Sequence, residues 1–106
     1  MLQLDESDND REIELHVGEE FEIHLPENPT TGFRWRLTSN GEPACILESN
    51  FFETADHSPP GRGGSHYWRF QAAQVGPGNI SLVYMRSFEQ EEKAARRFTL
   101  RVHIPA

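Results

Sequence analysis

The chain has 106 residues, a length that fits one small domain spanning residues 1–106. Apolar residues make up 36% and charged residues 25%, as is typical of a folded globular protein rather than a disordered one. Lysine and arginine number 10 and aspartate and glutamate 17, so the net charge is −7. This acidic balance argues against a nucleic-acid partner, because nucleic-acid binders are normally basic.

The N-terminal segment, MLQLDESDND, lacks the basic and then apolar residues of an export signal. No apolar stretch approaches the ~20 residues that a membrane-spanning helix needs. We therefore expect a soluble protein with no membrane partner. It would be cytoplasmic as written, and periplasmic or secreted if an export signal has been removed.

Apolar and polar residues alternate with period two along most of the chain, which is typical of strands with one buried face. The alternation predicts strands over 12–17, 20–26, 33–38, 44–54, 65–73, 79–86 and 95–104, and allows a short edge strand at 2–5. Both faces of 79–86 are apolar, which indicates a central strand. Residues 89–97 have no apolar stripe, so we expect a loop that leads into the last strand. Short connections are expected at 18–19 and 76–78.

Seven to eight antiparallel strands in about 100 residues predict an all-β fold, an immunoglobulin-like antiparallel β-sandwich. A small Greek-key barrel is the alternative. The single cysteine, Cys45, excludes an intramolecular disulfide and lies in the apolar run ACILE, so we expect a buried thiol rather than a nucleophile. Trp35 and Trp68 fall on apolar positions of the alternation, which favours core packing.

His16 and His24 would face each other across a hairpin of the first two predicted long strands. Two ligands do not make a closed metal site, so we expect no metal and no cofactor. His66 follows a glycine-rich segment, and its position fits either a place near that loop or an inward-facing strand residue. The chain shows no clustered set of catalytic residues, so we do not expect an enzyme.

Three connections have unusual composition, and antiparallel order would place them at one end of the sandwich. The first, NPTTG at 28–32, has a proline that fixes φ, a glycine free to adopt positive φ, and two threonines at a stiff tip. The second ends on GRGG at 61–64, whose glycines would let backbone amides approach a partner. The third, RSF at 86–88, offers a cation and an aromatic ring, which are favoured at interfaces. Together they predict a binding surface.

The three motifs resemble those of chagasin, the family of protein inhibitors of papain-like cysteine proteases found in protozoa and bacteria. The family pattern is N-P-T-T-G, then G-x-G-G, then R-P-W or R-P-F; this chain matches the first two and has Ser87 where the third has proline. The resemblance implies a papain-family cysteine protease as partner, and we expect a monomer. The residues that it assigns to protease binding are Asn28, Pro29, Thr30, Thr31, Gly32, Gly61, Arg62, Gly63, Gly64, Arg86, Ser87 and Phe88.

The resemblance further implies reversible, non-covalent occlusion of the active-site cleft. The residues 28–32 would lie over the catalytic Cys–His pair, the glycines would run along the substrate groove, and Arg86 and Phe88 would pack on the far wall. Ser87 predicts weaker inhibition than in relatives with proline, because the third loop is less stiff. The main alternative is an immunoglobulin-like adhesion or carbohydrate-binding module with no protease target.

Overall fold

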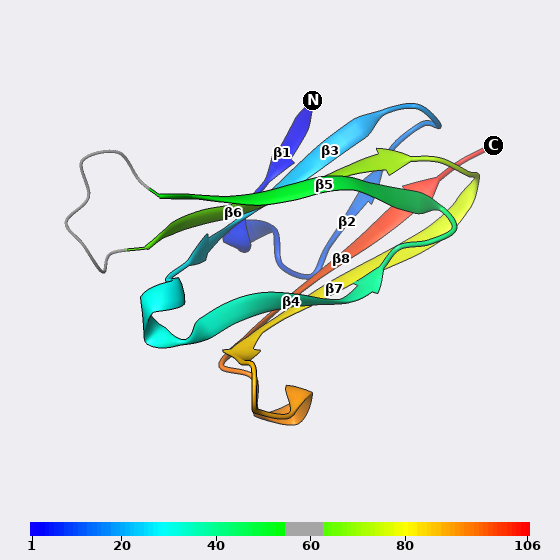
Figure 1. The fold of residues 1–106 in the computed structure, drawn as a ribbon. Coiled ribbons are helices and arrows are strands. Elements are labelled where there is room, and N and C mark those ends of the chain that lie inside the picture. Colours follow the sequence, from blue (N-terminus) through cyan, green and yellow to red (C-terminus); the bar gives the residue numbers. More distant parts are fainter. Residues whose placement is uncertain (55–62) are drawn as a thin grey trace.

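The computed structural model describes residues 1–54 and 63–106 (Figure 1). Its strands are β1 (Leu2–Leu4), β2 (Arg11–Glu14), β3 (Glu20–Glu27), β4 (Phe33–Asn40), β5 (Cys45–Thr54), β6 (Gly64–Ala72), β7 (Gly76–Arg86) and β8 (Arg96–Ile104). Short 3₁₀ turns occupy η1 (Glu6–Asp8), η2 (Pro29–Thr31) and η3 (Glu91–Lys93). In the part of the chain described here, no helix has the length and apolar character needed to cross a membrane.

The described strands form two four-stranded sheets, in the orders β1-β3-β6-β5 and β2-β8-β7-β4, which lie face to face (Figure 1). The predicted all-β sandwich is therefore confirmed. The strand β7 lies between β8 and β4, as its two apolar faces predict. It begins at Gly76, earlier than expected, because the segment 76–78 pairs with 102–104 instead of forming a loop. The short edge strand near the N-terminus is present as β1.

The core lies between the sheets and is built from the inward residues of the alternating pattern. Its largest fully buried side chains are Phe21, Phe70, Phe98, Leu4, Ile23, Leu25, Ile80, Leu82, Leu100 and Ile104. Trp35, Trp68 and Cys45 are buried with them, which confirms the expectation for all three. Burial raises the pKa of the Cys45 thiol to about 11, so this cysteine is a packing residue and not a nucleophile.

The first two long strands do not form the expected hairpin. The strand β2 pairs in parallel with β8, whereas β3 belongs to the other sheet and pairs in parallel with β1. His16 lies beyond the end of β2, and so the proposed pairing of His16 with His24 across a hairpin is wrong. Val17, the last residue of the predicted strand 12–17, is exposed in the same turn. Alternation indicates which face of a strand is buried, but it does not indicate which sheet receives the strand.

Two connections, β3–β4 and β7–β8, lie at one end of the sandwich, where β5 also ends and β6 begins (Figure 1). The register pairs that mark this end are Glu27 with Gly64, Thr54 with Gly64, and Phe33 with Arg86. We call this end the loop rim. Two residues of the second motif, Gly61 and Arg62, lie outside the described residues.

Candidate functional site

The β3–β4 connection, which we call the threonine loop (residues 28–32), is closed by its own hydrogen bonds. The Asn28 side-chain oxygen caps the turn, accepting the Thr30 backbone N–H at 3.2 Å and the Thr30 hydroxyl at 2.5 Å. The Thr31 hydroxyl donates to the Asn28 carbonyl at 2.8 Å. Pro29 occupies the first position of the 3₁₀ turn, and Gly32 ends it with φ +83°. The sequence NPTTG thus encodes a capped turn, with both threonines exposed at its tip.

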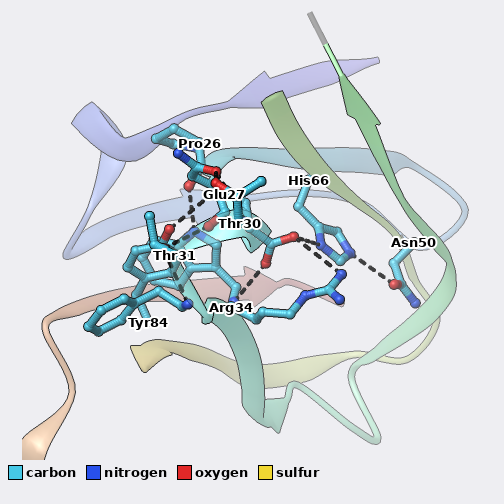
Figure 2. A network of polar contacts seen from close by, with 11 residues as sticks. Pro26, Glu27, Thr30, Thr31, Arg34, Asn50, His66 and Tyr84 are labelled. Atoms are coloured by element: carbon cyan, nitrogen blue, oxygen red, sulfur yellow. Dashed lines mark hydrogen bonds and ion pairs between the residues drawn. The ribbon is translucent and has the colours of Figure 1, made fainter. Parts of the chain in front are cut away.

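A buried carboxylate lies beneath the threonine loop (Figure 2). The Glu27 side chain is fully enclosed, and its Oε2 accepts the backbone N–H of Trp35 at 2.7 Å. Its Oε1 lies 3.0 Å from His66 Nδ1 and 3.7 Å from the Arg34 guanidinium. The other His66 nitrogen, Nε2, lies 2.9 Å from Asn50 Oδ1. We call these five residues the Glu27 network, and it joins β3, β4, β5 and β6.

A second set of contacts ties the threonine loop to β7. The backbone N–H of Asn28 donates to the Tyr84 hydroxyl at 3.1 Å. The Tyr84 ring packs against Trp35 and Phe33, with ring centres 4.9 and 5.5 Å away. The indole N–H of Trp35 in turn donates to the Pro26 carbonyl at 2.8 Å. The stem of the threonine loop is therefore held from both sheets of the sandwich.

Glu27 was not among the predicted site residues, although the sequence carries a signal for it. Glu27 continues the inward phase of Phe21, Ile23 and Leu25, and a charged residue in that phase is buried or ends the strand. His66 lies in the inward phase of β6 and also beside the loop rim. Both open interpretations of this histidine therefore hold: its ring stacks on Trp68 at 4.0 Å and it contacts the carboxylate under the threonine loop.

The two described glycines of the second motif are required inside the molecule. Gly63 has φ +74°, and a Cβ placed on it would lie 2.5 Å from the Glu27 carbonyl oxygen and 2.8 Å from Asn28 Cα. A Cβ on Gly64 would overlap the carbonyl oxygen of Glu53. The expectation was that these glycines admit a partner. The structure shows a further role for them: Gly63 lies against the base of the threonine loop, and Gly64 lies against β5.

The third motif forms an open turn at the end of β7. The Glu89 backbone N–H donates to the Arg86 carbonyl at 3.1 Å, which places Ser87 and Phe88 at the two central positions. The Arg86 guanidinium lies 4.7 Å from the centre of the Phe33 ring, a cation–π contact beside the threonine loop. Phe88 is the most exposed large apolar side chain among the described residues, at 79%. An aromatic ring is thus presented to solvent on the loop rim.

A rigid immunoglobulin-like sandwich with its unusual loops gathered on one rim belongs to the class of loop-presenting binding proteins. The sequence profile of the "Chagasin family peptidase inhibitor I42" matches residues 14–102, and the chain belongs to this family. The resemblance drawn from the three motifs is thereby confirmed, as is the expectation of an inhibitor rather than an enzyme.

Individual relatives agree with this assignment along nearly the whole chain. Amoebiasin-1 of Entamoeba histolytica is 36% identical over 97% of this chain and 99% of its own length. Chagasin of Trypanosoma cruzi is 33% identical over 87% of each chain. The crystal structure of EhICP2, a cysteine protease inhibitor from Entamoeba histolytica, covers 97% of this chain and 93% of its own with a TM-score of 0.81. Its identity is 21%, so it supports the fold.

Proposed function

We propose that this protein inhibits papain-like cysteine proteases by placing three segments, residues 28–32, 61–64 and 86–88, in the active-site cleft. Family membership supports an inhibitor, and the related EhICP2 is described as a cysteine protease inhibitor. The observation that carries the proposal is the threonine loop. It is exposed at the tip, closed by its own hydrogen bonds, and mounted on a buried carboxylate.

The physical logic is occlusion by a preformed shape. Ordering a flexible loop costs roughly 0.5–1.5 kcal/mol for each immobilised side chain, and this cost is subtracted from the binding free energy. In the threonine loop, Pro29 and the Asn28 cap already order the chain in the free protein, so binding does not carry that ordering cost. Its tip offers Thr30 and Thr31 hydroxyls within a tight 3₁₀ turn, not an extended peptide. No peptide bond of the loop is therefore laid out for attack by the protease thiolate.

The direct test follows papain hydrolysis of a fluorogenic peptide while this protein is added. We expect dose-dependent inhibition that is reversed by dilution, with the inhibitor recovered uncleaved. Trypsin, which uses a serine nucleophile, serves as the control and should keep its activity. Full papain activity with inhibitor in large excess would contradict the proposal and would favour the adhesion or carbohydrate-binding alternative.

A further inference from the structure

We propose that Glu27 is a positioning residue for inhibition: its buried carboxylate, together with His66, sets the pose of the threonine loop relative to β6. This inference rests on the proposed function and adds to it a residue outside the three motifs. Glu27 would not touch the protease. It would act through the loop that follows it.

Glu27 connects the two ends of the threonine loop. Glu27 is the last residue before the threonine loop, and Trp35 lies just beyond its exit into β4. One carboxylate oxygen accepts the Trp35 backbone N–H at 2.7 Å, so a single side chain links the entry and exit of the loop. The other oxygen contacts His66 at 3.0 Å and thereby fixes both stems to β6.

An open space lies beside the stem of the threonine loop. A surface hollow of about 210 Å³ adjoins the stem, lined by Pro26, Glu27, Asn28, Gly64, Tyr84 and Arg96. Packing therefore does not close the loop stem on that side. Polar contacts must hold the stem, and the strongest of them are charge-assisted bonds to Glu27.

His66 contributes two ring nitrogens to the Glu27 network. Both of its ring nitrogens face oxygen acceptors, Glu27 Oε1 and Asn50 Oδ1, so a doubly protonated ring satisfies both. A neutral ring is satisfied as well if the Asn50 amide turns to donate to Nε2. Among the described residues, the charged groups at this site are Glu27 from β3, Arg34 from β4, which reaches the same carboxylate oxygen, and Arg96 from β8, which lines the hollow beside the loop stem. β5 contributes the neutral Asn50.

The variant Glu27→Gln should behave differently with a neutral His66 ring and with a doubly protonated one. Its amide oxygen can still accept the Trp35 N–H, and its amide NH₂ then faces His66 Nδ1. A neutral ring accepts that bond and donates Nε2–H to Asn50, so the bonds to Trp35, His66 and Asn50 are kept and only the 3.7 Å contact with Arg34 is lost. When the ring takes a second proton, two donors face each other and the network breaks. The wild type has no such conflict.

The same strand offers a matched control. Glu22 is also a buried carboxylate with a histidine and an arginine partner, His24 at 2.5 Å and Arg69 at 3.1 Å. It lies nearer the middle of β3, opposite Arg69 in the ladder, and away from the loop rim. Glu22→Ala therefore removes a comparable network without touching the stem of the threonine loop.

The experiment measures papain inhibition constants and thermal midpoints for the wild type, Glu27→Gln, Glu27→Ala and Glu22→Ala. Assays run at about pH 8 and about pH 5.5, on either side of the range in which histidines ordinarily titrate. We expect Glu27→Ala to weaken inhibition about 30-fold at both values, as for a buried donor left unpaired. Inhibition by Glu27→Gln should stay within about threefold of the wild type at the higher pH and be about tenfold weaker than the wild type at the lower pH. Glu22→Ala should lower the thermal midpoint and leave inhibition within about threefold.

Equal weakening of inhibition by Glu27→Ala and Glu22→Ala would overturn the proposal, as would a flat pH profile for Glu27→Gln. If Glu27→Ala does not fold, the pH profile of inhibition by Glu27→Gln still tests the positioning role of Glu27. If the wild type fails to inhibit papain, the proposed function fails, and the positioning role is judged on the free protein. Amide exchange at residues 28–32 should then be faster in Glu27→Ala and unchanged in Glu22→Ala, and unchanged exchange in Glu27→Ala would refute the role.

Discussion

The threonine loop and the turn that carries Arg86, Ser87 and Phe88 share the loop rim but are ordered in different ways. The threonine loop is closed by side-chain and backbone hydrogen bonds and rests on the Glu27 network. The other turn has a single backbone bond across it, and its phenylalanine is mostly exposed. The first contributes a fixed shape and the second contributes contact area. Loosening the threonine loop should therefore weaken inhibition, whereas the other turn, which is less constrained, can still gain from stiffening.

The largest effect is expected from Gly63→Ala, which disturbs the base of the threonine loop. The new Cβ would overlap the Glu27 carbonyl oxygen, and the positive φ adds backbone strain. Together they should cost about 2 kcal/mol or more of the free energy of unfolding. Papain inhibition should fall about 30-fold or more with that displacement. Chemical denaturation and inhibition assays would measure the two effects.

Gly18→Ala is the control for Gly63→Ala. Gly18 also has a positive φ, +97°, but a Cβ there would meet nothing within 4 Å, and the residue lies at the opposite end of the sandwich. It should carry the backbone strain alone, about 1–2 kcal/mol, with inhibition unchanged. If both variants inhibit papain equally well, Gly63 does not support the threonine loop.

Phe88→Ala tests the contact area of the exposed turn. Since the ring is 79% exposed, its removal should leave the thermal midpoint unchanged. Inhibition should weaken by about 2 kcal/mol, roughly 30-fold, if the ring is an anchor in the complex. Val75→Ala, an exposed apolar residue at the opposite end, should change neither property. A drop in stability without a change in inhibition would contradict the assignment.

Thr31→Ala tests the preformed shape with less disruption. It removes the hydroxyl that donates to the Asn28 carbonyl and accepts from the Phe33 N–H. The loss should be about 1–1.5 kcal/mol of binding free energy, roughly a five- to tenfold weaker inhibitor. Thr38→Ala removes a comparable exposed hydroxyl bond, to the Ser81 carbonyl, in the body of β4. Equal inhibition by the two variants would argue against a special role for the threonine loop.

Ser87→Pro should have the smallest effect, in the opposite direction. Ser87 is the second residue of a turn closed by the Glu89 N–H and the Arg86 carbonyl, a position that proline favours. Stiffening that turn should make the binding free energy more favourable by about 0.4–1 kcal/mol, which corresponds to a two- to fivefold tighter inhibitor. Ser87→Ala is the control and should give no gain. An unchanged or weaker inhibitor on Ser87→Pro would show that this turn benefits from flexibility.

Period-two alternation predicts the long strands to within a few residues, because apolar residues mark the face of each strand that is buried. It does not predict the parallel pairings of β1 and β2 at the sheet edges, since a strand's neighbours depend on chain crossings between sheets. The misplaced hairpin of His16 and His24 follows from that limit. The three motifs were predicted to share one end, and the register of β3, β4, β6 and β7 places their described residues there.

The Glu27 network is less accessible to sequence reasoning. A glutamate and a histidine in inward positions signal buried polar groups, but their pairing depends on register. Glu27 lies opposite Gly64, and His66 lies opposite Leu25, so the two side chains meet diagonally. Similarly, the close approach of Gly63 to the threonine loop is a property of three-dimensional packing and cannot be read from a glycine-rich motif alone.

The most direct test of binding through the loop rim maps amide signals of the isotope-labelled protein during titration with papain. Signals of the threonine loop, of Gly63 and Gly64, and of residues 86–88 should shift or broaden together at stoichiometric papain. Signals at the opposite end, such as Gly18 and Gly41, should remain in place. Perturbations confined to that opposite end, or to the outer face of β5, would contradict binding through the loop rim.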